Sequence, residues 1–243
     1  RELRARTEDL LREQQQYLLM QREFVSMVSH EFRTPLATMQ GVLFMMQNAT
    51  GDDPEKRQRW IGMLRQSVGT LRELADQVLE LNRMGGDLPP VQITPLALTP
   101  FVHRYVATQA DLHGANRVVA EIDPLAPSVV RANSSLLRTV LDHFCANALK
   151  YSDPESIVRL RVGPVAGGVR LSVIDQGNGI ALSDQARIWE PFYRSPSSRH
   201  ISGTGLGLPI AHRAAELIGA TVGFESTPGT GSVFWIQFPV TPS

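Results

Sequence analysis

His30, Glu31, Thr34 and Pro35 stand close together in one apolar, helix-forming stretch of the sequence. The spacing of the neighbouring apolar residues turns His30 toward the outer side of the predicted helix, and Thr34 lies one turn further along the same face. A neutral imidazole can attack phosphorus, and the adjacent carboxylate of Glu31 can accept its other proton. The alternative is an ordinary surface histidine, but a proline inside a helix costs roughly 3 kcal/mol and argues for a special site.

A second group of polar residues stands at the predicted end of a helix that begins near Asn133. Asn147 offers a neutral oxygen that suits magnesium, Lys150 offers a positive charge for a phosphate, and Tyr151 offers an aromatic face. By themselves, these residues also fit an ordinary helix end with a cation near its carboxyl terminus.

Two glycine-containing segments follow. Asp175 comes after a predicted strand and precedes Gly177 and Gly179, which let the backbone approach a ligand while the carboxylate accepts a hydrogen bond from an exocyclic amine; a simple turn is the alternative. The run 203–208 opens a predicted helix whose backbone N–H groups form an anion site. Its spacing matches neither the dinucleotide-binding pattern nor the P-loop pattern. The polar stretch 189–200 between them predicts a mobile lid.

The elements that must position these residues fall into two parts. Residues 1–22 predict a helical coiled-coil lead-in, with Leu3, Leu10, Tyr17 and Phe24 seven positions apart, and residues 23–86 predict a helical hairpin. Pairing two hairpins in a dimeric four-helix bundle buries both apolar stripes, whereas the alternative packs the hairpin on the rest of its own chain. Residues 87–98 form the predicted linker to a second domain, 99–243.

In the second domain, predicted helices alternate with predicted strands. The helices lie near 99–113, 133–151 and 205–219, and the strands at 117–122, 156–162, 168–174, 221–225 and 232–238. The pair Gly167-Gly168 predicts a hairpin turn before one of these strands. This order predicts a mixed or antiparallel sheet with helices on one face, an α+β two-layer sandwich.

Composition limits the classes of function. The chain has 243 residues, 42% of them hydrophobic and 20% charged, which is typical of globular domains. The balance of 24 basic and 24 acidic residues argues against a protein that binds nucleic acid through a general basic field. One cysteine, Cys145, excludes an internal disulfide and favours a reducing compartment. There is no apolar run of about 18 residues, so we expect this piece of a longer chain not to span a membrane.

Taken in order, these segments resemble the catalytic core of the sensor histidine kinases, from about residue 20 to residue 239. The resemblance implies a dimerisation and phosphoacceptor domain followed by an ATPase domain of the gyrase and chaperone type. It implies that His30 is phosphorylated from ATP, that Glu31 is the general base, and that Thr34 orients water in phosphatase action. It also implies ATP and Mg²⁺ as cofactors, with Asn147 as the metal ligand.

The same resemblance implies a set of nucleotide-binding residues, in which Asp175 reads the adenine amine and Lys150 and Arg194 meet phosphates. The set comprises Asn147, Lys150, Tyr151, Asp175, Gly177, Gly179, Arg194, Gly203, Gly205, Leu206 and Gly207. The sequence departs from the family at His143, where a second asparagine is frequent. Because imidazole is a poor magnesium ligand, either Asn147, water and phosphate hold the metal or the kinase activity is weakened.

The implied partners are a second copy of the chain and the aspartate of a separate response-regulator receiver domain. No nucleic acid is expected, and a membrane is expected only through parts of the parent that this chain lacks, as in the cytoplasmic portion of a membrane-bound sensor. Two other functions fit less well. A gyrase-like or chaperone-like ATPase leaves His30 without a purpose, and a dimeric signalling adaptor with a degenerate nucleotide site has only His143 in its favour.

Overall fold

The structure of this chain is a computed structural model that describes residues 2–49, 53–85, 91–114, 116–198, 201 and 203–239. The described residues form two compact units. The first contains residues 1–76 together with 202–204, and the second contains residues 77–201 and 205–243. Each unit is described by itself below.

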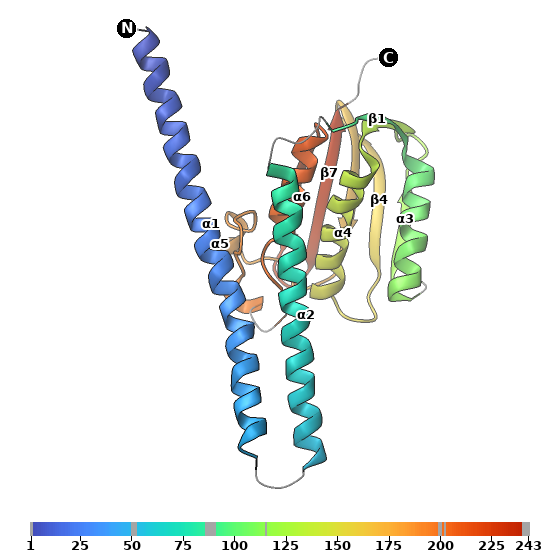
Figure 1. Cartoon of the computed structure of the whole chain (residues 1–243). Coiled ribbons are helices and arrows are strands. Elements are labelled where there is room, and N and C mark those ends of the chain that lie inside the picture. Colours follow the sequence, from blue (N-terminus) through green and yellow to red (C-terminus); the bar gives the residue numbers. More distant parts are fainter. Residues whose placement is uncertain are drawn as a thin grey trace. The chain divides into compact units, whose positions relative to one another are not determined.

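The first unit contains the long helix α1 (Glu2–Gln47) and most of α2 (Pro54–Gly85), whose last turns, after Asp76, belong to the second unit (Figure 1). Pro35 lies inside α1 without ending it. At the start of α2, Asp53 Oδ1 accepts the backbone N–H groups of Glu55 and Lys56 at 3.1 and 3.2 Å, and Pro54 occupies the first helical position, where its missing N–H is harmless. A capped start therefore fixes where the second helix begins. Leu3, Leu10 and Tyr17, which predict the coiled coil, lie outside the described side chains.

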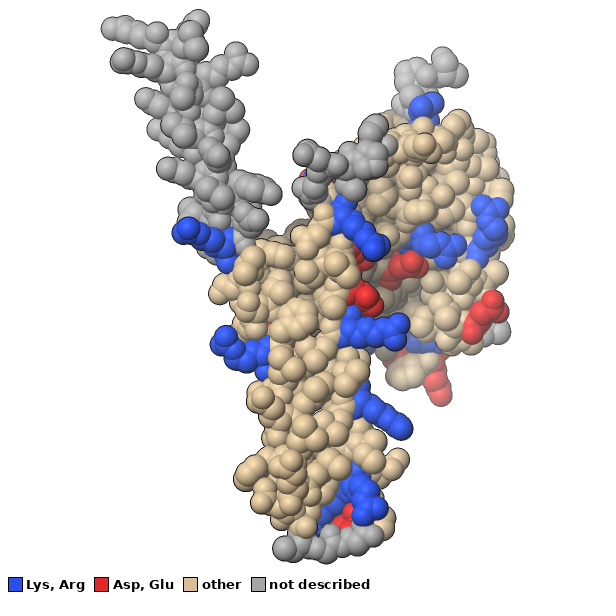
Figure 2. Space-filling model, viewed as in Figure 1, with Lys and Arg blue, Asp and Glu red and all other residues tan. Residues whose placement is uncertain are grey.

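The apolar stripe of α1 is only partly covered within a single chain. Val42 is 1% exposed, but Leu36, Leu43 and Phe44 are 47%, 49% and 67% exposed. No charged residue occurs from 34 to 51. Figure 2 accordingly shows a broad uncharged surface over the hairpin, bordered by basic residues. One helical hairpin therefore leaves a large part of its apolar surface in solvent.

The second unit is built on a five-stranded mixed sheet in the order β2-β4-β5-β7-β6. Its strands are β2 (Val118–Ile122), β4 (Val158–Val165), β5 (Gly168–Ile174), β6 (Thr221–Thr227) and β7 (Gly231–Pro239). β2 runs parallel to β4, and all other neighbours are antiparallel. β4 and β5 form a hairpin in which Gly167 has a φ of 73°, so glycine suits the tight turn.

Helices α3 (Leu98–His113), α4 (Ser134–Tyr151) and α6 (Gly207–Leu217) lie along one face of the sheet (Figure 1). The strands alternate, so every second residue faces these helices. The core between the layers contains Val158, Leu160, Val162, Val169, Leu171, Val173, Phe234, Ile236 and Phe238 from the sheet and Leu137, Val140, Leu141, Phe144, Ile210 and Ala214 from the helices. The predicted α+β two-layer sandwich is confirmed.

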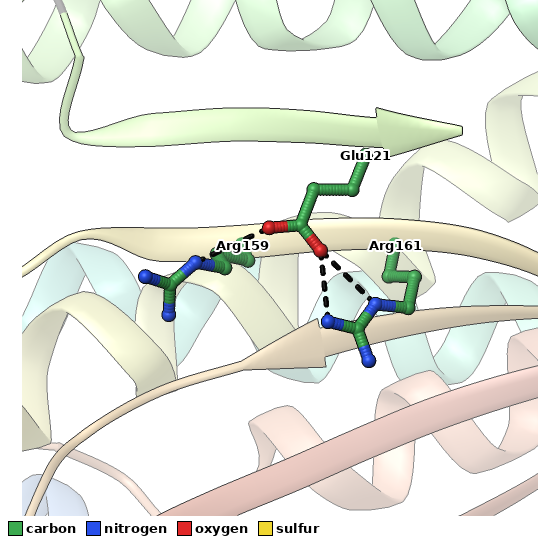
Figure 3. Close-up of polar contacts among 3 residues, drawn as sticks. All are labelled: Glu121, Arg159 and Arg161. Carbon is green, nitrogen blue, oxygen red and sulfur yellow. Dashed lines mark hydrogen bonds and ion pairs between the residues drawn. The ribbon is translucent and has the colours of Figure 1, made fainter. Parts of the chain in front are cut away.

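The other face of the sheet is polar. Glu121 on β2 pairs with Arg159 at 3.2 Å and with Arg161 at 2.9 Å, both on β4 (Figure 3). Further along, the Arg170 guanidinium lies 4.1 Å from the centre of the Trp235 ring. These long side chains keep their charges in water while they cover the strands, which explains why no second helical layer is needed.

A small two-stranded sheet was not predicted. β1 (Thr94–Ala97) pairs antiparallel with β3 (Val129–Ala132), and β1 occupies part of the predicted linker. Each strand has only four residues and β1 contains Pro95, so neither carries a readable alternation. The short helix α5 (Leu182–Gln185) and the 3-10 turn Pro196–Ser198 were also missed. Among the described residues, no helix combines the length and the apolar character that crossing a membrane requires.

Candidate active site

His30 projects outward from α1, as the spacing of the neighbouring apolar residues predicts. Its side chain is 73% exposed, and its Nδ1 lies 3.5 Å from Oε1 of Glu31. Because the carboxylate approaches Nδ1, the Nε2 atom remains available to solvent and to a reaction partner. The arrangement is an accessible nucleophile with a proton acceptor beside it.

One backbone hydrogen bond is missing from the helix beside this histidine. Pro35 has no N–H to offer the carbonyl four residues before it. The Thr34 hydroxyl donates to the His30 carbonyl at 3.4 Å, and the Thr38 hydroxyl donates to the Thr34 carbonyl at 3.1 Å. A shallow open depression on this face is lined by His30, Arg33, Thr34, Ala37 and Thr38. His30 and Thr34 therefore share one accessible surface.

In the second unit, Asp175 follows β5 and is only 8% exposed. Its Oδ1 accepts the backbone N–H of Gly177 at 2.8 Å and that of Ser232 at 3.1 Å. No described residue donates to its Oδ2. Burial raises the pKa of Asp175, while the two N–H groups oppose the rise. The result is an oriented carboxylate with one oxygen left for a ligand.

The glycines after Asp175 are required by close backbone packing. A Cβ at Gly177 would lie 2.4 Å from the Tyr151 carbonyl oxygen, and one at Gly179 would lie 2.1 Å from the Thr227 carbonyl oxygen. Gly179 also has a φ of 62°, which side-chain-bearing residues rarely adopt. The loop thus fits closely between the end of α4 and the end of β6.

The end of α4 carries the second predicted group. The Tyr151 carbonyl accepts the backbone N–H of Asn178 at 3.3 Å, so the last turn of α4 borders the Asp175 loop. Lys150 Nζ lies 5.1 Å from the centre of the Tyr151 ring. Asn147 stands one turn earlier, and its carboxamide has no hydrogen-bond partner among the described residues. The fold brings together two groups that are about 25 positions apart in the sequence.

The second glycine loop leads into α6. Gly205 has a φ of 75°, and a Cβ there would lie 2.7 Å from the backbone of Phe192, whose N–H donates to the Gly205 carbonyl at 3.0 Å. Leu206 is fully buried, and Gly207 begins the helix, whose first N–H groups suit an anion. Gly203 belongs to the first unit, whereas Gly205 and Gly207 belong to the second. The role of Gly203 in phosphate binding therefore stays a prediction.

The segment predicted to be a lid is tied down by a residue that sequence reasoning missed. The hydroxyls of Tyr193 and Ser195 both donate to Asp184, which is 7% exposed, and these bonds lower its pKa. Arg194 donates to the carbonyls of Ser198 and Ile201. Its predicted contact with phosphate is therefore a separate state that the structure does not display.

The residues present fit a nucleotide with a divalent cation. Oδ2 of Asp175 suits an amine, and the Asn147 carboxamide oxygen and the Lys150 ammonium suit a cation and a phosphate. Within the described part of the chain, no group of three or more His, Cys, Asp or Glu residues could hold a metal. A magnesium ion would therefore depend on Asn147, the phosphates and water.

Comparison with known families agrees with this arrangement. Residues 20–87 match the family described as "His Kinase A (phospho-acceptor) domain", and residues 132–242 match "Histidine kinase-, DNA gyrase B-, and HSP90-like ATPase". The chain is 32% identical over 228 residues to "Sensor-like histidine kinase SenX3" of Mycobacterium tuberculosis, which covers 90% of this chain. The chain spans about half, 53%, of that relative's length.

Two solved structures are similar over most of the chain. Full-length ShkA in complex with AMPPNP is 27% identical, with a TM-score of 0.61, and the match covers 89% of this chain and 45% of that one. Histidine kinase ThkA in complex with response regulator protein TrrA has a TM-score of 0.74 at 22% identity over 95% of this chain and 65% of that one, and it supports the fold. With both family models matched in this order, the chain belongs to the sensor histidine kinases, as their catalytic core.

Proposed function

We propose that this chain is an ATP-dependent protein histidine kinase that phosphorylates His30 and passes the phosphoryl group to an aspartate of a response regulator. The observation that carries the proposal is the exposed imidazole of His30 beside Glu31, in a chain that also has an oriented nucleotide-type carboxylate at Asp175. Neither feature alone distinguishes a kinase from an ATPase. Their presence in one chain supports phosphoryl transfer to nitrogen.

The chemistry at His30 follows from the position of Glu31. With its proton on Nδ1, toward the Glu31 carboxylate, the ring attacks the γ-phosphorus through Nε2. An Nε2–P bond forms, the bond from phosphorus to the β,γ-bridging oxygen breaks, and ADP leaves. The ring would then carry a positive charge, which Glu31 relieves by accepting the Nδ1 proton. Positioning and charge neutralisation supply most of the rate in such transfers.

The binding residues have separable roles. Oδ2 of Asp175 accepts the adenine amine, Tyr151 flanks the base, and Gly177 and Gly179 allow close approach of the backbone. Lys150 faces the phosphates, and the first turn of α6 after Gly207 receives their charge. Asn147 would hold a magnesium ion, which neutralises phosphate charge when bound.

Dimerisation and exchange with a regulator belong to the same proposal. The exposed Leu36, Leu43 and Phe44 support pairing of two hairpins in a four-helix bundle. ThkA, by its title, forms a complex with a response regulator protein, and we extend that partnership to this chain. The depression beside His30 and Thr34 is open to such a partner, and Thr34 would orient water when the chain acts as a phosphatase.

The test is incubation of the purified chain with γ-labelled ATP, followed by acid and base treatment of the protein. A label that acid removes and base leaves supports phosphohistidine. Release of phosphate without any covalent label would instead support an ATPase of the gyrase or chaperone type. Failure to bind a magnesium–ATP analogue would support the adaptor, in which the nucleotide site is degenerate.

A further inference from the structure

The end of α2 belongs to the second unit, where it contacts the helix that carries the nucleotide-binding residues. The boundary between the units falls after Asp76, so Gln77–Gly85 clusters with the ATPase domain. Glu80 on this segment accepts a hydrogen bond from the Thr139 hydroxyl of α4 at 3.1 Å through Oε1. Its Oε2 lies 3.5 Å from Nε2 of His143, also on α4. We call Glu80, Thr139 and His143 the α2 latch.

His143, where the resemblance leads us to expect an asparagine, has neighbours on both sides of its ring. The side chain is only 15% exposed. Nε2 of the ring faces Glu80, and Nδ1 faces the backbone of Gly207. A Cβ atom added to Gly207 would lie 3.1 Å from Nδ1. Gly207 begins α6 and closes the second glycine loop. One imidazole therefore connects the end of α2 with the predicted phosphate-binding loop.

The latch carries charge. The neighbouring His143 ring lowers the pKa of Glu80, so its carboxylate is ionised at neutral pH. Two other charged groups interact with Glu80 and His143: the positive Arg83 and the negative Asp142. The Arg213 side chain on α6 donates through Nε to the Met84 backbone carbonyl at 3.2 Å, which holds the same helix end on α6. Met84 itself is 6% exposed, so the helix end is packed there.

We propose that Glu80 and His143 are positioning residues that couple the end of α2 to the nucleotide site, so that the closed latch weakens nucleotide binding. The Glu80 carboxylate stands one imidazole ring away from the loop that would receive phosphates, and like charges repel. Closing the latch also keeps His143 pressed on Gly207. Nucleotide binding and the closed latch therefore oppose each other, and linkage makes this opposition reciprocal.

The coupling gives the helical hairpin a route to the nucleotide site. α2 is one continuous helix from Pro54 to Gly85, so a rotation or shift of that helix acts directly on Glu80. A change that pulls Glu80 away from His143 raises nucleotide affinity, and a bound nucleotide favours the open latch. This inference rests on the proposed nucleotide site but adds a regulatory input that the family assignment does not contain.

The experiment is a double-mutant cycle with two readouts. Glu80→Gln removes the charge, and His143→Asn restores the amide that the family often has. Each single variant is expected to bind Mg·AMPPNP about fivefold or more tightly in calorimetry, the low end of typical allosteric couplings. The double variant is expected to match the singles, because breaking either side opens the same latch. Effects that simply add in the double variant would overturn the coupling.

The second readout is hydrogen exchange, and its decisive comparison between variants is made without nucleotide. Hydrogen exchange of the backbone amides of 77–85 is expected to speed up in nucleotide-free Glu80→Gln, and to speed up in the parent chain when Mg·AMPPNP is added. The matched control is Glu121→Gln, which breaks the ion pairs on the outer face of the sheet (Figure 3) and should leave exchange in this segment unchanged. Equal exchange in the two nucleotide-free variants would overturn the latch. If the parent chain binds no Mg·AMPPNP, the proposed function is refuted instead. The comparison of the two nucleotide-free variants would still test whether the latch exists.

Discussion

Asp175 and Ser232 are joined by two hydrogen bonds across the ends of β5 and β7. The Asp175 backbone N–H donates to the Ser232 carbonyl at 2.9 Å, and the Ser232 backbone N–H donates to Asp175 Oδ1 at 3.1 Å. The first bond extends the strand pairing by one residue, and the second orients the carboxylate. Because two rigid strands hold it, the side chain is preorganised before a ligand arrives.

Asp175→Asn should weaken ATP binding while it keeps the hydrogen bonds that hold the side chain in the fold. An amide oxygen can still accept both backbone N–H groups, but the other position is then an NH2 group, which donates and cannot accept a hydrogen bond from the adenine amine. We expect ATP affinity to fall about tenfold or more, which corresponds to about 1.4 kcal/mol. Calorimetry with Mg·AMPPNP measures this change. Asp123→Asn, in an exposed turn of the same unit, is the matched control and should bind normally.

The same substitution should change how the free energy of unfolding depends on pH, and the direction of that change can be predicted. Burial raises the pKa of Asp175, so the folded state holds this proton more tightly than the unfolded chain does. In the parent, the contribution of Asp175 to the free energy of unfolding is therefore greatest below its unfolded pKa and is lost as pH rises through the raised folded pKa. At pH 7, Asp175→Asn should equal or exceed the parent in urea unfolding. A clear loss of stability there would contradict this account of the buried charge.

His30→Gln should abolish the acid-labile label from γ-labelled ATP and leave Mg·AMPPNP affinity unchanged. The side chain is 73% exposed, so its loss should alter the free energy of unfolding by no more than about 0.5 kcal/mol. His103→Gln, at an exposed position on α3, is the control that should keep the label. Full labelling of the His30 variant would refute the assignment of the phosphorylated residue.

Glu31→Gln tests the proton acceptor. Its amide can no longer take the Nδ1 proton of His30 at 3.5 Å, so the rate of phosphorylation should fall about 100-fold or more while nucleotide affinity stays the same. Single-turnover labelling at saturating ATP measures the rate directly. A variant as fast as the parent would assign the proton to solvent and remove Glu31 from the mechanism.

Gly179→Ala should be far more damaging than Gly219→Ala, although both glycines have a positive φ, 62° and 68°. At Gly219 the added methyl group meets open space, so only backbone strain of about 1 to 2 kcal/mol is expected. At Gly179 the methyl group meets the Thr227 carbonyl at 2.1 Å, which adds about 1 to 3 kcal/mol. Urea unfolding followed by tryptophan fluorescence compares the two. Similar losses would mean that the Gly179 loop gives way easily.

Leu43→Glu should weaken the homodimer. Leu43 is 49% exposed in the single chain and lies seven residues after Leu36, on the same side of α1. A charge buried between paired hairpins is costly, so sedimentation should show a shift toward monomer at micromolar concentration. Leu43→Met keeps the apolar volume and should remain dimeric. If the glutamate variant stays fully dimeric, the dimer contact lies elsewhere.

The local elements of this chain were readable because each signal is repeated within a short stretch. The helices near 133–151 and 205–219 and the strand at 168–174 were predicted close to where α4, α6 and β5 occur. Outward placement of His30 followed from the apolar residues on either side of it. Such patterns depend only on the period of a helix or a strand, which is a property of neighbouring residues.

Other features of the site had no signal in the sequence. Nothing local links Asp175 to Ser232, Gly179 to Thr227, or Glu80 to His143, because each pair is brought together by strand pairing or helix packing over 48 to 63 positions of chain. Asp184 looked like an ordinary acidic residue until the hydroxyls of Tyr193 and Ser195 were found on it. The four-residue strands β1 and β3 were missed for a related reason, since each depends on its partner.

The sequence by itself determined which chemical groups are present and the type of most of the elements that carry them: a nucleophilic histidine on an amphipathic helix, and a carboxylate and glycines after a strand. Only the tertiary structure decided how those groups are oriented. It fixed Asp175 Oδ1 on two backbone N–H groups, and it placed His143 between Glu80 and Gly207. The physical reason is that residue types follow a local periodicity, whereas hydrogen-bond partners and steric limits arise between segments that meet only on folding.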